Sequence, residues 1–484
     1  MTVRLTSLVK RHLGVDPEIT GVTADSRKVK PGFLFAALSG SQTDGAAFAA
    51  RAVEAGAVAV LADEDQNLSV PTLVCCDPRR GYALAAANFW GRQPQTCVAV
   101  TGTNGKTSVA SFCRQMFAQA GHVSASMGTL GVTVSRPGGV VDQITPPGLT
   151  TPDAGDVAEL LMRISQLGVT HFAMEASSHG IDQRRLDGVR LSAAGFLNLT
   201  QDHLDYHGTM EGYRGAKLRL FEQLMPRGAT AVLNADSEAF PFFAAASIVS
   251  GQRVMSVGET GQALRLMERT LLPDGQRLTI RAEGRLYDVR LPLVGAFQAS
   301  NALVAAGLCR AAGLSYDDTF AALEKIEGAP GRLQRVGQGP RGGEAYVDYA
   351  HTPDGLETVL RALRPHVRGR LIVVFGAGGD RDKTKRPLMG RLAATLADVA
   401  IVTDDNPRSE VPAAIRAGVM SGTEGLTEIG DRRAAIQAAA ALLQDGDILV
   451  VAGKGHEQGQ TVGTTVYPFD DVAETAKALE LVHG

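Results

Sequence analysis

The sequence predicts an α/β protein of three domains, and three observations lead to this fold class. A chain of 484 residues is too long for one ordinary core and, at ~100–200 residues per domain, suggests about three. Short apolar runs alternate with polar loops and helical patterns, which is typical of parallel sheets covered on both faces. Linker-like segments occur at residues 91–94 and 328–331. We therefore expect a small N-terminal α/β domain (1–93), a central parallel-sheet domain (94–328) and a C-terminal Rossmann-like α/β domain (329–484).

The N-terminal domain is predicted from one helical pattern and two strand-like runs. Residues 46–55 are alanine-rich and helical in pattern, and the runs are residues 57–62 and 72–76. Because strand and helix patterns alternate, this part indicates a small α/β unit.

The central domain is predicted from four apolar runs that each end in polar residues. The runs are residues 97–100, 171–174, 193–197 and 229–233, and a helical pattern at 109–120 follows the first. Residues 263–294 instead alternate apolar and polar side chains around a Pro-Asp-Gly turn at 273–275. That alternation predicts an antiparallel ribbon inserted in or flanking the parallel sheet.

The C-terminal domain repeats the pattern of a strand followed by a polar loop. Its strand-like runs are residues 345–348, 371–375, 399–402 and 448–451. Ligands of open α/β sheets bind beyond the carboxyl ends of the strands. The loops after these runs therefore predict a ligand-binding domain.

Composition excludes several classes of function. The 48 basic and 51 acidic residues leave a net charge of -3, so no basic excess points to nucleic acid or to an anionic membrane. Aromatic residues make up 5%, which also disfavours a base-stacking surface. The first twenty residues mix charged with apolar side chains and contain no signal-peptide core, and no apolar stretch approaches ~18 residues. The five cysteines form no Cys-x-x-Cys pair, so we expect a cytoplasmic protein in a reducing compartment.

The strongest local motif is a glycine-rich loop between a strand-like run and a helical pattern. It reads Gly102-Thr103-Asn104-Gly105-Lys106-Thr107-Ser108. Backbone N–H groups of such a turn and the following helix N-terminus form a cradle for phosphate, to which Lys106 adds charge and Thr107 a hydroxyl for Mg²⁺. The general phosphate-loop pattern would place glycine where Val100 stands, so an ordinary glycine-rich loop is the alternative. The strand-loop-helix context favours binding of a nucleotide phosphate.

Candidate metal ligands follow other strand-like runs of the central domain. Glu175 comes directly after one run, and His203 and Asp205 lie in a His/Asp-rich loop. Each alone is more often a helix cap or a surface residue. If they converge beside the phosphate loop, they suit Mg²⁺, which prefers carboxylate and water ligands.

Charged residues also gather after the C-terminal runs. They are Arg332, His351, Asp354, Asp380, Arg381, Lys383, Asp405, Arg408, Lys454, His456 and Glu457. A solvated rim is one interpretation. The number of arginines and carboxylates favours the other, a site for a zwitterionic ligand.

With these motifs, the chain resembles the Mur ligase family over essentially its whole length, in the same three-domain order. Residues 102–107 match the family's G-T-N-G-K-T phosphate loop, which accounts for Val100. The strings MEASSHG at 174–180, NLTQDHLDYHG at 198–208 and DYAHTPD at 348–354 match its other blocks. The resemblance implies an ATP-dependent acid–amino-acid ligase with a UDP-binding N-terminal domain, an ATP-binding central domain and an amino-acid-binding C-terminal domain.

The implied reaction joins meso-2,6-diaminopimelate to the D-glutamate γ-carboxylate of UDP-N-acetylmuramoyl-L-Ala-D-Glu through an acyl phosphate. This reaction belongs to peptidoglycan synthesis, and thus to cell wall biogenesis, cell shape and cell division. ATP, the UDP-linked dipeptide and diaminopimelate are the implied partners, without nucleic acid or membrane, and we expect a monomer.

The resemblance also implies roles for single residues. For ATP these are Gly102, Thr103, Asn104, Gly105, Lys106, Thr107, Ser108, Asn301, Arg332 and His351. For Mg²⁺ and catalysis they are Lys106, Thr107, Glu175, His203 and Lys217, the last as a carbamate (N6-carboxylysine) formed with CO₂. For the UDP-muramoyl-dipeptide they are Ser26, Ser41, Gln42, Thr43, Thr150, Thr151, Ser177, Gln183 and Arg185. For diaminopimelate they are Arg381, Asp405, Asn406, Pro407, Arg408, Gly453 and Glu457.

Two kinds of rival remain. A sister ligase would add lysine, or glutamate to folate, but Asp, Asn, Pro and Arg at 405–408 favour diaminopimelate. A phosphate-loop phosphotransferase or nucleotide switch would perform no ligation. That rival leaves the charged third domain unexplained.

Overall fold

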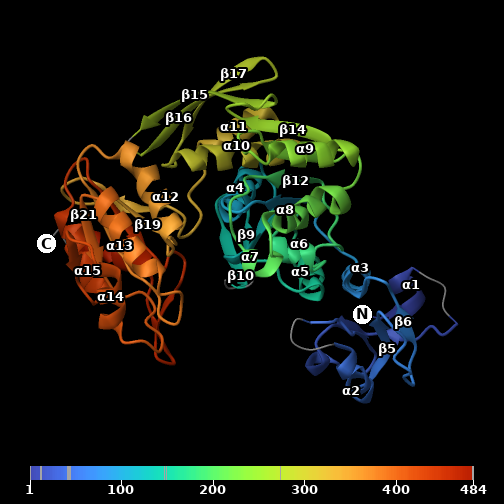
Figure 1. The fold of residues 1–484 in the computed structure, drawn as a ribbon. Helices are drawn as coiled ribbons and strands as arrows, with labels where there is room; N and C mark the ends of the chain where they lie inside the picture. The colour runs from blue at the N-terminus through green and yellow to red at the C-terminus, as the bar shows by residue number, and fades with distance from the viewer. Residues whose placement is uncertain are drawn as a thin grey trace. The chain divides into compact units, whose positions relative to one another are not determined.

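The computed structural model describes residues 2–10, 14–40, 45–145, 148, 150–272 and 274–481. The chain divides into two compact units, Met1–Arg265 with Leu303–Ala322 and Leu266–Ala302 with Leu323–Gly484. Figure 1 shows the elements of both units along the chain. No helix in the described ranges combines the length and the apolar character needed to cross a bilayer.

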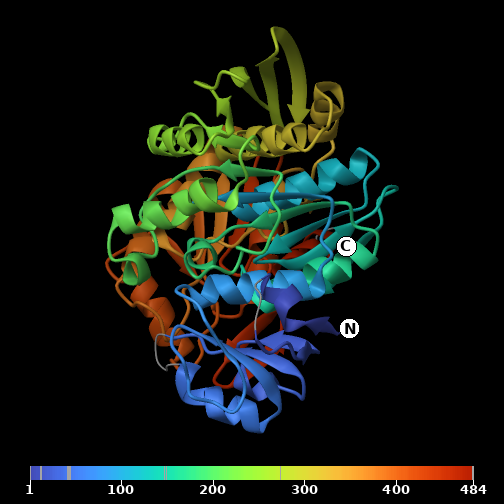
Figure 2. The same ribbon diagram turned by 90° about the vertical axis from the view of Figure 1, so that its right-hand side faces the viewer.

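The first unit begins with a four-stranded parallel sheet of order β3-β4-β5-β6, drawn in blue in Figures 1 and 2. Its strands are β3 Gly21–Thr23, β4 Phe33–Ala36, β5 Ala57–Ala62 and β6 Thr72–Val74, and its helices are α1 Leu5–Val9, α2 Ala49–Glu54 and α3 Pro78–Trp90. An antiparallel pair of strands, β1 Val3–Arg4 and β2 Glu18–Ile19, precedes this sheet in the sequence. Alternate residues of β4 face opposite sides: Leu34 packs with Tyr82 of α3, whereas Phe35 packs with Ala52 of α2.

These elements refine the sequence prediction. The strand at residues 57–62 is confirmed, and the second strand is shorter than expected because it ends at Val74. The expected helix starts with a 3₁₀ turn, Gly45–Phe48, before α2. The predicted linker after residue 90 follows the end of α3, where Gly91 has φ 69°.

The central sheet runs in the order β10-β9-β8-β11-β7-β12-β13-β14 and continues into β15. The strands are β7 Thr96–Thr101, β8 Ser124–Gly128, β9 Gly131–Ser135, β10 Val141–Thr145, β11 His171–Glu175, β12 Ala193–Phe196, β13 Thr230–Asn234, β14 Arg253–Gly258 and β15 Leu264–Leu272. From β8 to β14 every pair is parallel, as predicted, but β9 and β10 form an antiparallel edge. β9 buries Val132 and Val134, whereas no residue of β10 is buried, so the edge lacks the continuous apolar run of a central strand.

Helices cover both faces of this sheet. They are α4 Lys106–Gln119, α5 Ala154–Gln166, α6 Ser178–Asp182, α7 Leu204–His207, α8 Met210–Arg219, α9 Phe240–Val249, α10 Ala296–Ala311 and α11 Tyr316–Leu323, with a π-helical turn, η3 Leu220–Leu224. On one face, Phe196 of β12 stacks on Phe243 of α9 with ring centroids 3.7 Å apart. On the other, the Cys113 thiol of α4 contacts the Ala305 carbonyl of α10 at 3.9 Å. The sheet is therefore the buried middle layer of the sandwich.

The second unit contains the predicted ribbon and a six-stranded sheet. In the ribbon, β16 Gly275–Ala282 and β17 Arg285–Leu291 pair antiparallel, as predicted. Pro273 of the predicted turn is outside the described residues. The six-stranded sheet has the order β18-β19-β23-β20-β21-β22, with β18 antiparallel and the other strands parallel.

Helices also lie on both faces of the six-stranded sheet, drawn in orange in Figure 1. Its strands are β18 Gln334–Gln338, β19 Glu344–Asp348, β20 Leu371–Phe375, β21 Val399–Val402, β22 Leu426–Glu428 and β23 Ile448–Ala452. Its helices are α12 Pro353–Leu363, α13 Lys385–Leu396, α14 Pro412–Met420, α15 Arg432–Leu442 and α16 Asp471–Leu481, and a hairpin follows β23 with β24 Gly459–Val462 and β25 Thr465–Pro468. Val373 packs with α12, α13 and α14, whereas Ile372 packs with α15 and α16. Both faces are buried, which explains the continuous apolar strands.

Candidate active site

The phosphate loop follows β7, the strand at which the order of strand addition in the central sheet reverses. The chain leaves β7 toward β8 on one side, past β11, and later places β12 on the other side. Such a switch point is where open α/β sheets bind ligands. Gly105 caps α4 with φ 89°, a left-handed conformation that favours glycine. The N–H groups of the first turn of α4 therefore follow the loop directly, which is the arrangement of a phosphate cradle.

Asn198, which follows β12, braces this loop. Its side-chain Oδ1 accepts hydrogen bonds from the N–H groups of Thr103 (3.1 Å) and Asn104 (2.9 Å). Its Nδ2 donates to the Asn104 carbonyl at 3.2 Å. Sequence reasoning placed Asn198 at a strand end but gave it no role. The available signal was that a polar residue directly follows a strand.

Two lysines share one acceptor in the loop. Lys106 Nζ donates to the carbonyls of Gly102 (2.9 Å) and Thr103 (2.8 Å), and Lys217 Nζ donates to the same Gly102 carbonyl at 2.8 Å. Lys217, from α8, is only 1% exposed and lies 4.4 Å from the centre of the Tyr213 ring. Burial, followed by the charge of Lys106, lowers the pKa of Lys217 well below its ordinary value. The neutral amine of Lys217 therefore forms more readily than that of an ordinary exposed lysine.

Glu175 ends β11, the strand beside β7, and its side chain is buried. Its Oε1 accepts a hydrogen bond from the Thr129 N–H at 2.9 Å. Gly128 makes room for it, because a Cβ on Gly128 would lie 1.9 Å from that oxygen. The carboxylate is thus fixed by backbone groups at the end of β8.

His203 and Asp205 lie in the segment around α7, beside other imidazoles. His203 has φ 52° and is the N-cap residue of α7, and Asp205 is in the first turn of that helix. The His203 ring packs edge-on against His179 with centroids 4.9 Å apart. Burial, followed by the charges of His203 and His207, lowers the pKa of His179. Among the described residues, no group of three or more His, Cys, Asp or Glu could hold a metal ion unaided.

Five residues predicted to contact the dipeptide lie in two segments, one just before α5 and one after β11. They are Thr150, Thr151, Ser177, Gln183 and Arg185. The Thr151 hydroxyl lies 2.9 Å from that of Ser177, and Arg185 donates to the Thr151 carbonyl (2.5 Å) and to Gln183 Oε1 (2.7 Å). Ser177 also caps α6, accepting from the Gly180 N–H at 3.0 Å. These contacts orient one guanidinium and several hydroxyls in a single cluster.

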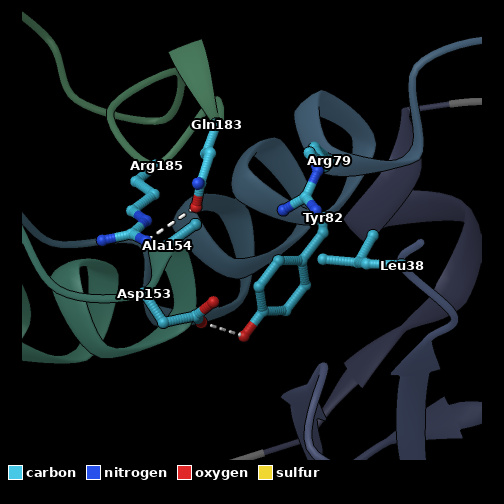
Figure 3. A pocket seen from close by; sticks show the side chains of 7 residues that line it. All are labelled: Leu38, Arg79, Tyr82, Asp153, Ala154, Gln183 and Arg185. Carbon is cyan, nitrogen blue, oxygen red and sulfur yellow. Dashed lines mark hydrogen bonds between the residues drawn. The ribbon is translucent and has the colours of Figure 1, made fainter. Parts of the chain in front are cut away.

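A pocket extends from this cluster to the N-terminal sheet (Figure 3). It is lined by Leu38, Arg79, Tyr82, Asp153, Ala154, Gln183 and Arg185. Asp153 accepts a hydrogen bond from the Tyr82 hydroxyl at 2.6 Å, while Gln183 and Arg185 come from the turn after α6. Burial lowers the pKa of the Arg185 guanidinium. The negative charge of Asp153 opposes this shift but only partly offsets it. An anionic group would suit the pocket.

The remaining contacts predicted for the UDP end are in the first unit. Ser26 is half-buried in a 3₁₀ turn, Ser26–Lys28, that Asp25 caps. Ser41, Gln42 and Thr43 lie outside the described residues.

Asn301, Arg332 and His351 belong to the second unit. Asn301 is buried and donates to Gln298 Oε1 at 3.1 Å, and Gln298 in turn contacts the Arg332 carbonyl at 3.5 Å. The guanidinium of Arg332 lies 5.0 Å from the ring centre of Tyr349, and His351 contacts the Tyr349 carbonyl at 2.8 Å. The structure thus links the three residues through Gln298 and Tyr349.

The predicted amino-acid site lies beyond the carboxyl ends of β20, β21 and β23. These loops carry Arg381, Asp405, Asn406, Pro407, Arg408, Gly453 and Glu457. Arg408 has φ 52°, and its Nη1 donates to the Gly379 carbonyl at 2.7 Å. Asn406 Nδ2 donates to Glu457 Oε2 at 2.9 Å. The arrangement brings a guanidinium and several carboxylates to one sheet edge, as a zwitterionic ligand requires.

Three family models match successive parts of the chain. Residues 18–87 match "Mur ligase family, catalytic domain", residues 100–309 match "Mur ligase middle domain" and residues 331–455 match "Mur ligase, glutamate ligase domain". Together these stretches contain the phosphate loop and most of the site residues described above.

Known proteins resemble the chain over most or all of its length. A Caulobacter vibrioides protein named UDP-N-acetylmuramoyl-L-alanyl-D-glutamate–2,6-diaminopimelate ligase is 68% identical over 482 residues, 99% of each chain. A solved structure of a ligase with the same name is 33% identical, with a TM-score of 0.78 and 100% of both chains covered. A Mycobacterium tuberculosis folylpolyglutamate synthase complexed with ADP shares the fold, at 19% identity, a TM-score of 0.63, and 84% and 94% coverage of this chain and of that chain.

Proposed function

The chain belongs to the Mur ligase family, and we propose that it adds meso-2,6-diaminopimelate to the D-glutamate γ-carboxylate of UDP-N-acetylmuramoyl-L-Ala-D-Glu, with ATP. The observation that carries the choice of amino acid is Arg408, a half-buried arginine in the same loop as Asn406, whose side chain bonds to Glu457. Relatives bearing this activity in their names cover nearly the whole chain. The reaction is a step of peptidoglycan precursor synthesis.

We place the substrates in three domains, 1–93 for the UDP end, 94–328 for ATP and 329–484 for the amino acid. Each matching family model falls within one of these ranges. Ser26, Ser41, Gln42 and Thr43 would bind the UDP end, and the cluster around Thr151 and Arg185 the muramoyl-dipeptide. Asn301, Arg332 and His351 would contact the nucleotide. ATP and a UDP-linked substrate are consistent with a reaction in the cytoplasm. We propose that the enzyme acts as a monomer, because one chain contains every residue named here.

In this mechanism the γ-carboxylate oxygen attacks the γ-phosphorus of ATP, which releases ADP and forms an acyl phosphate. The amine of diaminopimelate then attacks the acyl carbon, so that the amide forms and phosphate leaves. Lys106 and the N-terminus of α4 neutralise negative charge on the transferring phosphoryl group. Asn198 keeps the loop in shape for this task. The protein therefore acts chiefly through position and charge.

The residues around the loop fit Mg²⁺. Thr107, a buried residue in the first turn of α4, offers a hydroxyl, Glu175 a carboxylate and His203 an imidazole, and a carbamate on Lys217 would add a second carboxylate. Mg²⁺ is usually held by one or two carboxylates together with substrate phosphates and water, so a complete protein cage is not required. The ion would supply charge stabilisation for phosphoryl transfer.

Replacing Arg408 by alanine is expected to collapse the preference for diaminopimelate over L-lysine. The two amino acids differ by one distal carboxylate, which a guanidinium can bind in bidentate fashion. Breaking such a pair costs ~2–5 kcal/mol, or roughly 30-fold to several-thousand-fold in specificity. The measurement is kcat/KM for both amino acids by phosphate release, with the UDP-dipeptide present.

The same assay tests the proposed function in the parent enzyme. Phosphate release should require both the UDP-dipeptide and an amino acid. Equal use of lysine and diaminopimelate by the parent would remove Arg408 from its proposed role, and release without either substrate would favour a phosphotransferase. Glutamate on a folate acceptor is the control for the folylpolyglutamate alternative.

Replacing Gly128 by alanine should cut turnover by about 10²-fold, because the new Cβ forces the Glu175 carboxylate out of position. Overpacking should also cost ~1–3 kcal/mol of stability. Phosphate release and thermal unfolding measure the two effects. Gly215→Ala is the matched control, since a Cβ on Gly215 meets nothing within 4 Å. Parental activity in a folded Gly128→Ala variant would contradict the role of Glu175.

A further inference from the structure

Lys454 is a buried cation that the mechanism above leaves without a role. It follows β23, and its side chain is 0% exposed. An ammonium group loses its hydration when buried, so it is retained only where oxygen atoms replace the water. Burial lowers the pKa of Lys454, and the negative charges of Asp405 and Glu457 oppose that shift.

Four oxygen atoms from three segments surround this ammonium. Lys454 Nζ donates to Asn406 Oδ1 at 2.8 Å and to the Gly459 carbonyl at 2.7 Å. It also lies 3.6 Å from Asp405 Oδ1 and 3.5 Å from Glu457 Oε2. The ammonium therefore joins the loop after β21, the loop after β23 and the start of β24.

The orientation of the Asn406 side-chain amide depends on the Lys454 ammonium. Its Oδ1 accepts from Lys454 and from the Thr461 N–H (2.9 Å), so its Nδ2 is left to donate to Glu457 Oε2 at 2.9 Å. The two acceptor bonds fix which end of the amide faces Glu457. Lys454 consequently orients both Asn406 and Glu457.

The β24–β25 hairpin connects the contacts around Lys454 to Arg408. The Arg408 N–H donates to the Thr461 carbonyl at 3.0 Å, and the Gly463 N–H donates to the Arg408 carbonyl at 2.7 Å. Gln460 Nε2 donates to the Asp405 carbonyl at 2.8 Å. Arg408 is thus held in its left-handed conformation from the hairpin, whose first residue is bound by Lys454.

We propose that Lys454 is a positioning residue for the amino-acid substrate, because its ammonium ties Asn406, Glu457 and the hairpin that holds Arg408 into one arrangement. This inference rests on the proposed function, in which that loop binds diaminopimelate. Lys454 acts through its neighbours and does not itself touch the reacting atoms. A lysine needed only to fill space could be replaced by methionine of similar length at little cost.

The test compares Lys454→Met with Lys477→Met, a lysine whose side chain is 65% exposed on α16. We expect Lys454→Met to raise the KM for diaminopimelate and lower kcat/KM by roughly 30-fold or more, and to weaken the preference over L-lysine. The KM values for ATP and for the UDP-dipeptide should stay within about threefold of the parent. Lys477→Met should match the parent throughout.

Gln460→Leu is the second variant, because it removes one hairpin contact and leaves the buried ammonium in place. It should raise the KM for diaminopimelate about 3- to 10-fold. If Lys454→Met does not fold, this variant decides. An unchanged KM for diaminopimelate in a folded Lys454→Met or in Gln460→Leu would overturn the inference, as would equal loss for all three substrates. A parent enzyme that ligates no diaminopimelate would instead refute the proposed function.

Discussion

Replacing Lys106 by alanine is expected to leave a folded protein with almost no turnover. Lys106 is the first residue of α4, and its ammonium donates to two carbonyls of the phosphate loop. The residue is half-exposed and is not part of the core. Its removal takes away a point charge aimed at the transferring phosphoryl group. Cationic groups in this role are worth on the order of 10³-fold or more in rate.

Phosphate release with saturating UDP-dipeptide and diaminopimelate measures the loss of turnover, and thermal unfolding measures stability. Lys325→Ala is the matched control, because Lys325 is an exposed lysine outside the loop. A folded Lys106→Ala variant with near-parental turnover would exclude residues 102–108 as the ATP site. Lys106→Arg should recover little activity, since the forked guanidinium does not reproduce a compact ammonium at a phosphate.

Periodicity predicted the buried strands best. The strands β5, β20 and β21 begin and end at the predicted residues, because a strand covered on both faces needs an uninterrupted apolar run. The antiparallel edge β9–β10 was not predicted, since Asp142 and Gln143 face solvent and break the run. The N-terminal strands β3 and β4 were also not predicted, and β3 has only 3 residues.

The site could be predicted only in part, because its decisive contacts join residues far apart in sequence. Glu175 and the phosphate loop could be placed from strand ends alone. Asn198 lies 94 residues from Asn104, so its support of the loop appears only when β12 is placed beside β7. Lys454 was one of many charged loop residues in the sequence, and its complete burial separates it from that group. Spacing would never have selected Lys217.

Replacing Lys217 by alanine should abolish phosphoryl transfer while nucleotide binding is retained, because we propose that Lys217 carries CO₂ as a carbamate. The neutral amine attacks CO₂, a C–N bond forms, and one proton is released, which leaves a carboxylate on the side chain. The structure provides the needed amine, since burial and the charge of Lys106 lower the pKa of Lys217. Lys106 and Lys217 share the Gly102 carbonyl, so an ammonium on Lys217 would be repelled by that of Lys106, whereas a carbamate anion there would be attracted to it.

Lys217→Arg should fail as well, because a guanidinium stays protonated and cannot form the carbamate. The expected loss is on the order of 10³-fold in phosphate release for both variants, with ADP affinity within a few-fold of the parent. A short carboxylic acid added to Lys217→Ala should restore part of the activity, whereas it should do nothing for Lys106→Ala. Intact mass of the parent, taken under conditions that preserve carbamates, should show one added CO₂ that Lys217→Ala lacks. A parent without that added mass that still turns over at full rate would show that Lys217 acts as the amine, and that the second carboxylate of the proposed Mg²⁺ site comes from elsewhere.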